Sequence, residues 1–363
     1  MYGSPGPGTG DAVKRGSRGA GKVSLASPFS RLAKLRRVLR RGEIAFRRGD
    51  LVLAERSGRW VLDRLSSRHS DQATLRPGER EALIAAGELV GCVRRELTDF
   101  VGASDMHREA LTMLDSTADE PQLDHSRLAV LGRLGETLRL LGHFAEAEDH
   151  LVRAVRLSDQ FLPADPVPRA DALNGLGILF KDTQRFAEAG DHYRQALELL
   201  EQSLGPEDLQ LAAIYHNLAG LEHAQDRFVE GEPHARRALH LRAQHEGLTT
   251  TGAAADLGVL GALLLGQRRY PEAELVLGQS LAIWQAKFGP QHYEVAVAQH
   301  NLAALYAARG EQARALRTLT QVLDTKKRIL GTTHPDVTAL RRHIERYADT
   351  SPRLTRPSHL EAP

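Results

Sequence analysis

The sequence predicts an all-α protein built from stacked helical hairpins, on three observations. From Arg127 onwards, a 42-residue pattern repeats without a change of spacing. The phrase HNLA occurs at His216–Ala219 and returns at His300–Ala303, in another copy of the pattern. Only 5% of the 363 residues are aromatic, whereas Ala, Leu and Gly are abundant, which suits helices packed closely through small side chains better than it suits strands.

Residues 1–30 form a basic head that we expect to be disordered. Gly, Ser and Pro are frequent there, and apolar side chains are too few to offset the entropy lost on ordering the chain. Residues 1–48 hold 12 Lys and Arg against 2 Asp and Glu, whereas the rest of the chain holds 36 against 44. The head therefore either folds back on the acidic body or meets an acidic partner, and nucleic acid or an anionic membrane is a possible partner only through this head.

Residues 31–125 are expected to hold a basic helix followed by two degenerate helical hairpins. The apolar residues at helical spacing in the basic helix are Leu32, Leu35, Val38 and Leu39. The amphipathic helix over 31–41 either caps the array or binds phosphate groups, and the lack of aromatic residues among its basic ones favours the cap. We assign the two hairpins to residues 42–69 and 79–114.

Residues 126–349 are expected to form a regular array that ends in a capping helix, followed by a disordered tail over 350–363. The full units begin at Arg127, Arg169, Leu211, Ala253 and Val295. In each unit a Leu, first Leu134, is followed directly by Gly or Ala, and a second small residue comes twelve positions later. Small residues at these two positions let two antiparallel helices approach closely, which predicts one hairpin in each unit.

These columns resemble the tetratricopeptide repeat, whose second helix carries the pattern seen at Ala147, Leu151 and Ala154. The unit has 42 residues, against about 34 in ordinary tetratricopeptide repeats. This length, together with the turns LGPED at Leu204–Asp208 and FGPQH at Phe288–His292, is similar to the kinesin-light-chain type. The resemblance implies a right-handed α-solenoid whose first helices line a concave groove.

In that family, side chains just before the Leu column, and one helical turn to either side, point into the groove. The resemblance therefore implies a peptide-binding groove with the lining residues Arg133, Glu136, Asp171, Asn217, Val259 and Asn301. An Asn amide offers both a donor and an acceptor to an extended peptide. Two alternatives stay open: each Asn instead hydrogen-bonds an adjacent repeat, and Arg133 is solvated or ion-paired.

Motifs for catalysis are absent from the sequence. It holds no GxxxxGKS/T loop, no GxGxxG after a strand, no HExxH and no GxSxG elbow. The histidines lack metal-ligand spacing, and His292 and His334 fall in turns, where capping or exposure explains them. Cys92 lies in an apolar run that favours burial. We therefore expect no catalytic residues, no metal site and no cofactor.

The sequence thus predicts a non-catalytic, cytoplasmic protein that binds a protein or an extended peptide. Its single cysteine cannot form an internal disulfide, its first residues lack the apolar core of a signal peptide, and its longest apolar run is too short to span a bilayer. Two functions remain open. One is a scaffold or adaptor that holds a partner segment in the groove. The other is a sensor in which a ligand changes the superhelix and so releases or recruits a partner protein. The partner and the oligomeric state stay open.

Overall fold

The computed structural model describes residues 28–66, 75–117, 120–161 and 165–350, and within these ranges it contains helices and turns but no strand. The helices are α1 (Pro28–Arg47), α2 (Leu51–Ser66), α3 (Pro77–Glu96), α4 (Phe100–Asp115), η2 (Pro121–Leu123), α5 (Asp124–Leu140), α6 (Phe144–Ser158), η3 (Asp159–Phe161), α7 (Val167–Asp182), α8 (Phe186–Leu204), α9 (Leu211–Ala224), α10 (Phe228–His245), α11 (Thr251–Gly266), α12 (Tyr270–Phe288), α13 (Tyr293–Ala308), α14 (Gln312–Leu330) and α15 (Pro335–Thr350). The expected disorder of residues 1–30 and 350–363 concerns segments that lie, apart from 28–30 and 350, outside the described residues.

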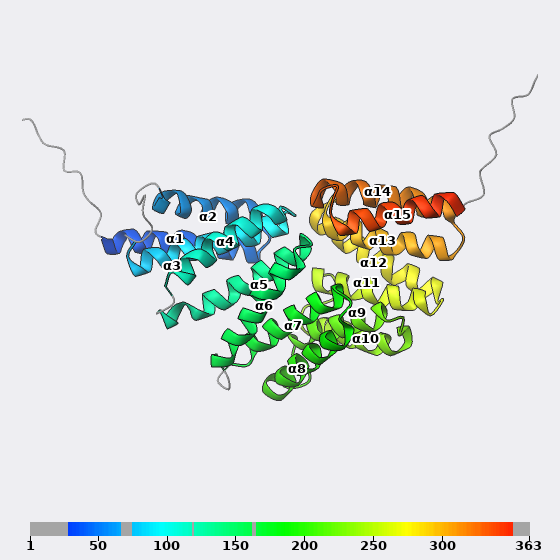
Figure 1. Ribbon diagram of the computed structural model, residues 1–363, viewed down its shortest axis with the longest axis horizontal. Coiled ribbons are helices and arrows are strands. Elements are labelled where there is room, and N and C mark those ends of the chain that lie inside the picture. The colour runs from blue at the N-terminus through cyan, green and yellow to red at the C-terminus, as the bar shows by residue number, and fades with distance from the viewer. Residues whose placement is uncertain (1–27, 67–74, 118–119, 162–164, 351–363) are drawn as a thin grey trace, which may run out of the picture.

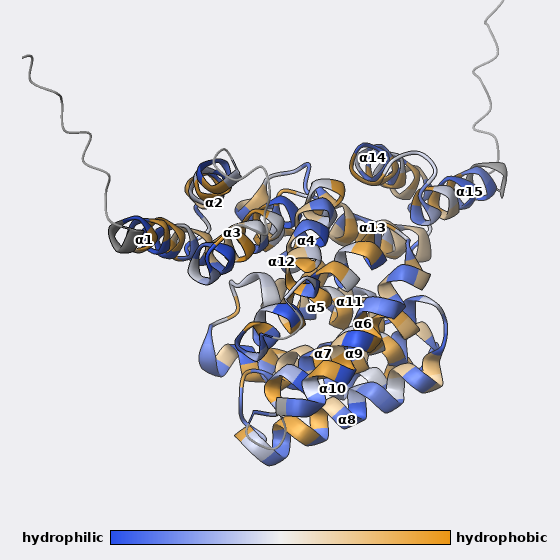
Figure 2. Ribbon diagram, turned by 60° about the vertical axis from the view of Figure 1, so that its left-hand side comes forward, coloured by the Kyte–Doolittle hydropathy of each residue, from blue (hydrophilic) through white to orange (hydrophobic). Residues whose placement is uncertain are grey.

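Successive helices pair as hairpins, and the hairpins follow one another along a curved row (Figure 1). The pairs run from α1 with α2 to α13 with α14, and α15 packs on α14 at the end of the row. The apolar sides of the helices face their neighbours and the polar sides face outward (Figure 2). The all-α solenoid of helical hairpins that the sequence predicts is confirmed.

The small residue after each column Leu is where the two helices of a hairpin touch. A Cβ atom placed on Gly177 would lie 2.4 Å from a ring carbon of Tyr193, and one on Gly261 would lie 2.4 Å from Leu277. Both distances are far below van der Waals contact, so larger side chains would push the helices apart. The second small column is fully buried from Ala147 to Ala315. The prediction that both columns must be small is confirmed.

The N-terminal hairpin differs from the one expected. The basic helix does not end near residue 41 but continues through Gly42 to Arg47 as α1, and it pairs with α2. The expectation of a separate hairpin over 42–69 is therefore wrong. Gly42 lies inside the helix, and a Cβ there would lie 2.7 Å from Leu89 Cδ2 and 2.8 Å from Ser57 Cβ. Its lack of a side chain lets α1 approach both α2 and α3.

The apolar stripe of α1 packs as the sequence predicts. Leu35 and Leu39 are buried in the main core, and Arg36 is exposed and bonded to Glu81 at 3.1 Å. Lys34 lies over the ring of Trp60, with its nitrogen 5.5 Å from the ring centroid. The described part of the basic segment thus covers the end of the array, and some of its charge is matched by α3.

The row of hairpins curves far enough for its two halves to touch. The ends of α3 and α5, in the N-terminal half, contact the turns before α13 and α15, in the C-terminal half. The His292 Nε2 atom lies 3.0 Å from the carbonyl oxygen of Glu96, and His334 Nε2 lies 3.0 Å from that of Leu140. In both turns the other ring nitrogen accepts a hydrogen bond from the backbone N–H two residues later, so each histidine caps a helix, as expected. The ring of Phe100 meets that of Tyr293 edge to face at 5.8 Å, which places the start of α4 beside the start of α13 (Figure 2).

Candidate functional site

The first helices of successive hairpins meet in a fixed register, which we call a junction. At the charged junction, Arg133 Nη1 on α5 donates to Glu88 Oε1 on α3 at 2.7 Å. At the asparagine junction, Asn217 Nδ2 on α9 donates to Asn174 Oδ1 on α7 at 2.7 Å. In both, the residue just before the column Leu reaches the first helix of the preceding hairpin. The predicted groove column therefore lies at the junctions.

Between these two junctions lies one that no side-chain pair bridges at the same register, although Arg139 and Asp182 join the same two helices farther along. Gly132 on α5 and Gly175 on α7 occupy the corresponding positions and line one cavity, and we call this place the glycine junction. A Cβ atom on Gly132 would have no heavy atom within 4 Å, whereas one on Gly175 would lie 3.0 Å from Leu151 Cδ2. The missing side chains leave a cavity of about 460 Å³ over Leu151 and Ala154 of α6.

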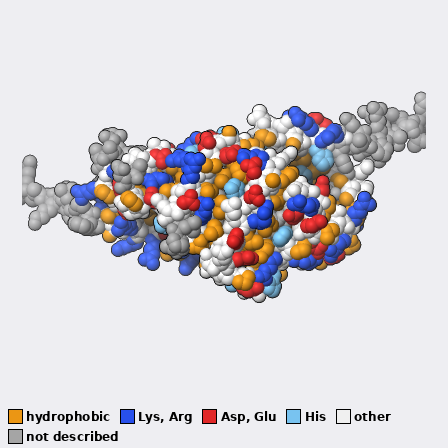
Figure 3. All heavy atoms as spheres, turned by 60° about the horizontal axis from the view of Figure 1, so that its bottom comes forward, with side chains coloured by type: hydrophobic (Ala, Val, Ile, Leu, Met, Phe, Trp, Pro, Cys, Tyr) orange, Lys and Arg blue, Asp and Glu red, His pale blue; other side chains and the backbone are white. Residues whose placement is uncertain are grey.

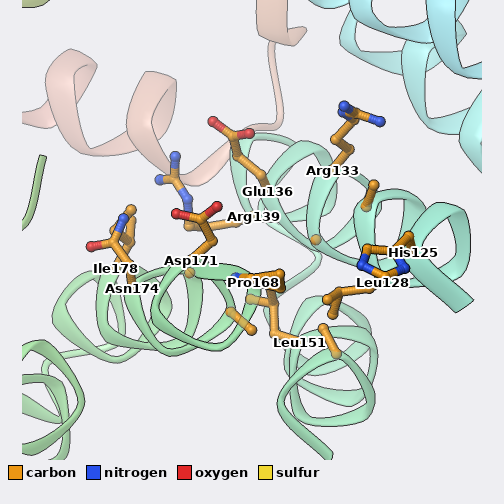
Figure 4. A pocket seen from close by; sticks show the side chains of 15 residues that line it. His125, Leu128, Arg133, Glu136, Arg139, Leu151, Pro168, Asp171, Asn174 and Ile178 are labelled. Carbon is orange, nitrogen blue, oxygen red and sulfur yellow. The ribbon is translucent and has the colours of Figure 1, made fainter. Parts of the chain in front are cut away.

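Three of the predicted groove residues line this cavity. Arg133 and Glu136 reach it from α5, and Asp171 reaches it from α7 on the opposite side (Figure 4). Helices from the C-terminal part of the chain pass beside Glu136 and Arg139, because the two halves of the molecule touch there (Figure 4). The cavity is thus bounded by two first helices, a floor from α6, and the edge of the contact between the halves.

Most charges around the cavity are matched by neighbours. The ion-paired alternative for Arg133 is the one observed, since the side chain bonds Glu88. Glu136 Oε2 lies 2.7 Å from Arg95 Nη1, and Arg139 pairs with Asp182.

Asp171 differs from these charged groups. Burial raises the pKa of its carboxyl, and the negative charge of Asp165 raises it further. The residue is nevertheless exposed, since the cavity wall on which it stands surrounds its carboxyl only in part.

The other three predicted residues lie outside the cavity. Asn217 makes the bond to Asn174, so the alternative of a hydrogen bond to an adjacent repeat is the one observed for it. Val259 is half-buried against the core around Leu260. Asn301 lies at the junction between α11 and α13, where its Nδ2 would be 3.9 Å from a Cβ placed on Gly258. The predicted column is therefore divided between a cavity and packed contacts.

Asn174 is a cavity residue that the sequence reasoning missed. It lines the cavity from α7, one helical turn beyond Asp171, and its carbonyl oxygen accepts the bond from Asn217. Its two amide hydrogens are the groups that a bound peptide carbonyl would meet. The available signal was that Asn174 is a polar residue one position before the predicted column, within the apolar stretch that runs from Ala172 to Phe180.

A second hollow, of about 230 Å³, lies where the two halves touch. Its lining includes Glu96 and Phe100 from one half and His292 and Glu294 from the other. Burial lowers the pKa of the His292 imidazole and raises that of the Glu294 carboxyl. Glu136 and Arg139 line this hollow as well as the cavity, so the two spaces share a wall.

Other polar clusters have structural surroundings. Asp256 is fully buried, and its two oxygens meet His216 Nδ1 at 2.8 Å and Arg242 Nε at 2.6 Å, which ties α9, α10 and α11 together. Burial raises the pKa of the Cys92 thiol, which keeps it protonated and a poor nucleophile. Among the residues that the structure describes, no three His, Cys, Asp or Glu side chains are grouped so that they could hold a metal ion.

The surface carries mixed charge. Acidic and basic side chains alternate over the face seen in Figure 3, with apolar side chains between them. Many of these charges are paired, as in the contacts of Arg185 with Glu148 and of Arg237 with Glu207, both at 2.7 Å. Within the described ranges, each helix is too short or too polar to cross a membrane.

The geometry agrees with a comparison to known families. The family model described as "Tetratricopeptide repeat" matches residues 168–244 and 253–342. These two stretches are therefore tetratricopeptide repeats. The chain's 42-residue units have long second helices such as α8 and α12, each of 19 residues. No curated protein matches the sequence of this chain.

Solved structures share the tetratricopeptide fold. RapI in its apo form matches with a TM-score of 0.60 and 13% identity, over 82% of this chain and 98% of that one. A Rap protein complexed with competence and sporulation factor matches with a TM-score of 0.54 and 13% identity, over 87% of this chain and 99% of that one. BtubC (BKLC) from P. vanneervenii matches with a TM-score of 0.50 and 21% identity, over 66% of this chain and 92% of that one. At these identities the likeness establishes the fold alone.

Proposed function

We propose that this protein is a non-catalytic scaffold that binds an extended segment of a partner protein at the glycine junction. The observation that carries the proposal is the cavity itself. It lies between first helices, where Gly132 and Gly175 replace the side chains that bridge the junctions on either side. Tetratricopeptide proteins in general act as scaffolds for other proteins. The single cysteine favours a cytoplasmic setting for this one.

The shape and chemistry of the cavity suit a peptide. A volume of about 460 Å³ falls within the usual range of about 300 to 1,000 Å³ for ligand pockets. Its floor is apolar, and its rim offers the amide of Asn174 and the carboxylate of Asp171. An apolar floor with a few polar groups at its edge is the arrangement that fixes an extended chain through its backbone and selects its side chains through a pocket.

The test uses peptides selected from a library of short random sequences displayed on phage, with the full-length chain immobilised. The decisive variant is Gly132→Leu, because the site of its new side chain is open and lies in the cavity. The control is Gly278→Leu, which also adds Leu to an open position in a helix but lies on α12. We expect the selected peptides to bind the wild type and the control equally, and to bind Gly132→Leu at least about tenfold more weakly. Equal binding to all three would contradict the proposal.

A second candidate, a peptide-responsive regulator, is favoured by the wall that the cavity shares with the contact between the halves. A ligand beside Glu136 and Arg139 would touch residues that also line the hollow near His292. The Rap protein of similar fold was solved with competence and sporulation factor bound. A ligand that favours one of two arrangements of the halves shifts the populations of the two arrangements, which would change the surface available to a partner protein.

The two candidates differ in a measurable distance. Fluorescent labels on α2 and α14 report the separation of the halves by energy transfer, with and without a selected peptide. A regulator predicts that the peptide changes the transfer efficiency, and that His292→Ala changes it in the free protein. A scaffold predicts the same efficiency in all three samples.

A further inference from the structure

The charges around the glycine-junction cavity do not balance. Arg133 pairs with Glu88, Glu136 with Arg95, and Arg139 with Asp182. Among the described residues, Asp171 forms no ion pair, and the neighbouring charge that acts on its carboxyl is the like charge of Asp165. Negative charge is therefore left over at one point of the cavity wall.

The surroundings of Asp171 explain why a cation would gain there. Asp171 is exposed, but the cavity wall beside it and the like charge of Asp165 both raise the pKa of its carboxyl, so its charged form is less stable than that of an isolated aspartate. A positive group brought to it restores that stabilisation, and a charge-assisted hydrogen bond is stronger than a neutral one. A second carboxylate or an apolar group would leave the deficit in place.

The apolar part of the cavity selects among cations. Leu128, Leu151, Pro168 and Ala172 line it. Figure 4 shows Pro168 and Leu151 below Asp171 and to one side of it. A Lys or Arg side chain combines a long aliphatic stem with a terminal charge, so it can cover such a surface while its head reaches a carboxylate. A small inorganic cation would leave the floor uncovered.

The position of Asn174 fixes how the backbone would lie. Asp171 and Asn174 are three residues apart on α7 and so point from the same face, with Cβ atoms about 5 to 6 Å apart. The side-chain carbonyl oxygen of Asn174 accepts a hydrogen bond from Asn217, which leaves its amide hydrogens to donate to a ligand. A peptide carbonyl at Asn174 and a basic head group at Asp171 belong to one residue of an extended peptide.

We propose that the cavity at the glycine junction is a subsite for a Lys or Arg side chain of the bound segment, with Asp171 as its counter-ion and Asn174 as the anchor of its backbone. This inference rests on the proposed function and adds the chemistry of the partner. The partner segment is thus one that places a basic residue in an extended, accessible stretch.

The experiment uses pools of short peptides, acetylated and amidated at their ends, in which the central residue is fixed and the others are randomised. The fixed residue is Lys, Arg, norleucine or Glu, and norleucine keeps the aliphatic stem without the charge. Each pool is incubated with the immobilised full-length chain, and retained peptide is quantified by mass spectrometry. The variants are Asp171→Asn, Gly132→Leu and the control Asp149→Asn, which removes an exposed carboxylate from α6 outside the cavity lining.

We expect the wild type and Asp149→Asn to retain the Lys and Arg pools about tenfold or more above the norleucine and Glu pools. Asp171→Asn should abolish that preference while still retaining peptide, and Gly132→Leu should retain little of any pool. A wild type that shows no basic preference, or a preference that survives Asp171→Asn, overturns the inference and leaves the proposed function standing. Equal retention of every pool by wild type and Gly132→Leu overturns both.

Discussion

The glycine junction and the asparagine junction are neighbours with the same arrangement of helices, and they differ in whether side chains fill the space between those helices. At the asparagine junction, Asn217 and Asn174 close the space between α7 and α9 with a hydrogen bond. At the glycine junction, Gly132 and Gly175 leave the space between α5 and α7 open. The array therefore keeps one architecture while single residues decide whether a junction is packed or available to a ligand.

The charged junction extends the comparison and gives the largest expected effect, which depends on pH. His107 is fully buried near Arg133 and Arg95, and burial lowers its pKa to about 4. Its unfolded pKa is about 6.5. Because the unfolded chain binds the proton more tightly, stability is full above pH 6.5 and falls as the pH drops towards 4, by up to about 3 kcal/mol from this residue.

Urea unfolding followed by circular dichroism at several pH values measures this loss. In His107→Leu, a side chain of similar volume that cannot take up a proton, we expect the loss between pH 6.5 and 4.5 to be smaller than in the wild type. His300, whose pKa is also lowered to about 4, remains in that variant and should maintain part of the slope. An unchanged slope in His107→Leu would mean that the ring is not neutral in the fold.

The next effect separates two reasons for glycine in a first helix. Gly177 contacts the buried ring of Tyr193, so Gly177→Ala should destabilise the fold by about 1–3 kcal/mol through overpacking. Gly132 faces open space, so Gly132→Ala should stabilise it by about 0.5–1 kcal/mol, since alanine favours a helix over glycine. Urea unfolding measures both changes. A loss of stability in Gly132→Ala would show that this position is packed and would remove the contrast between the junctions.

The asparagine junction should behave as a structural bridge. Asn217→Ala and Asn174→Ala each remove one partner of the bond and should cost about 1 kcal/mol. The double variant should cost less than the sum of the two single changes, because both remove the same bond. Strict additivity of the free energies of unfolding would show that the two amides do not interact.

The smallest effect lies away from every junction and serves as a control on binding. Thr98, in the turn between α3 and α4, has a φ of 61°, which is unfavourable for a β-branched residue. Thr98→Gly should relieve that strain and stabilise the protein by about 0.5 kcal/mol, after the loss of chain entropy is subtracted. The affinity for selected peptides should stay unchanged. A change in affinity would mean that binding depends on overall stability or on the hollow between the halves, which Thr98 also lines.

Periodic features of the fold could be predicted from the sequence, because stacked repeats place equivalent residues in equivalent surroundings. The hairpins and the small columns are such features, and Gly177 against Tyr193 is one instance. The extent of α1 could not be predicted, because glycine usually favours the end of a helix, whereas Gly42 lies inside one and allows a close contact. The contacts of His292 and His334 with residues almost 200 positions earlier also had no signal, since they depend on the curvature of the whole row.

The candidate site could be predicted in part, because its residues occupy equivalent positions in successive repeats. The family pattern points to a column of residues, and Arg133, Glu136 and Asp171 do meet in one cavity. The pattern does not show that the Asn217 amide donates a hydrogen bond to Asn174, because that bond joins different columns of successive repeats. The two glycines that open the cavity could be read from the sequence. Their consequence could not, because a cavity forms only where both helices of a junction lack a side chain.

Hydrogen exchange of the full-length chain, with and without a selected peptide, tests the central claim most directly. If the glycine junction is the binding site, the peptide should slow exchange in α5 and α7, and the effect should vanish in Gly132→Leu but not in Gly278→Leu. Protection confined to α9 and α13, or to the second helices on the outer side of the row, would contradict the account and would place the partner elsewhere on the solenoid.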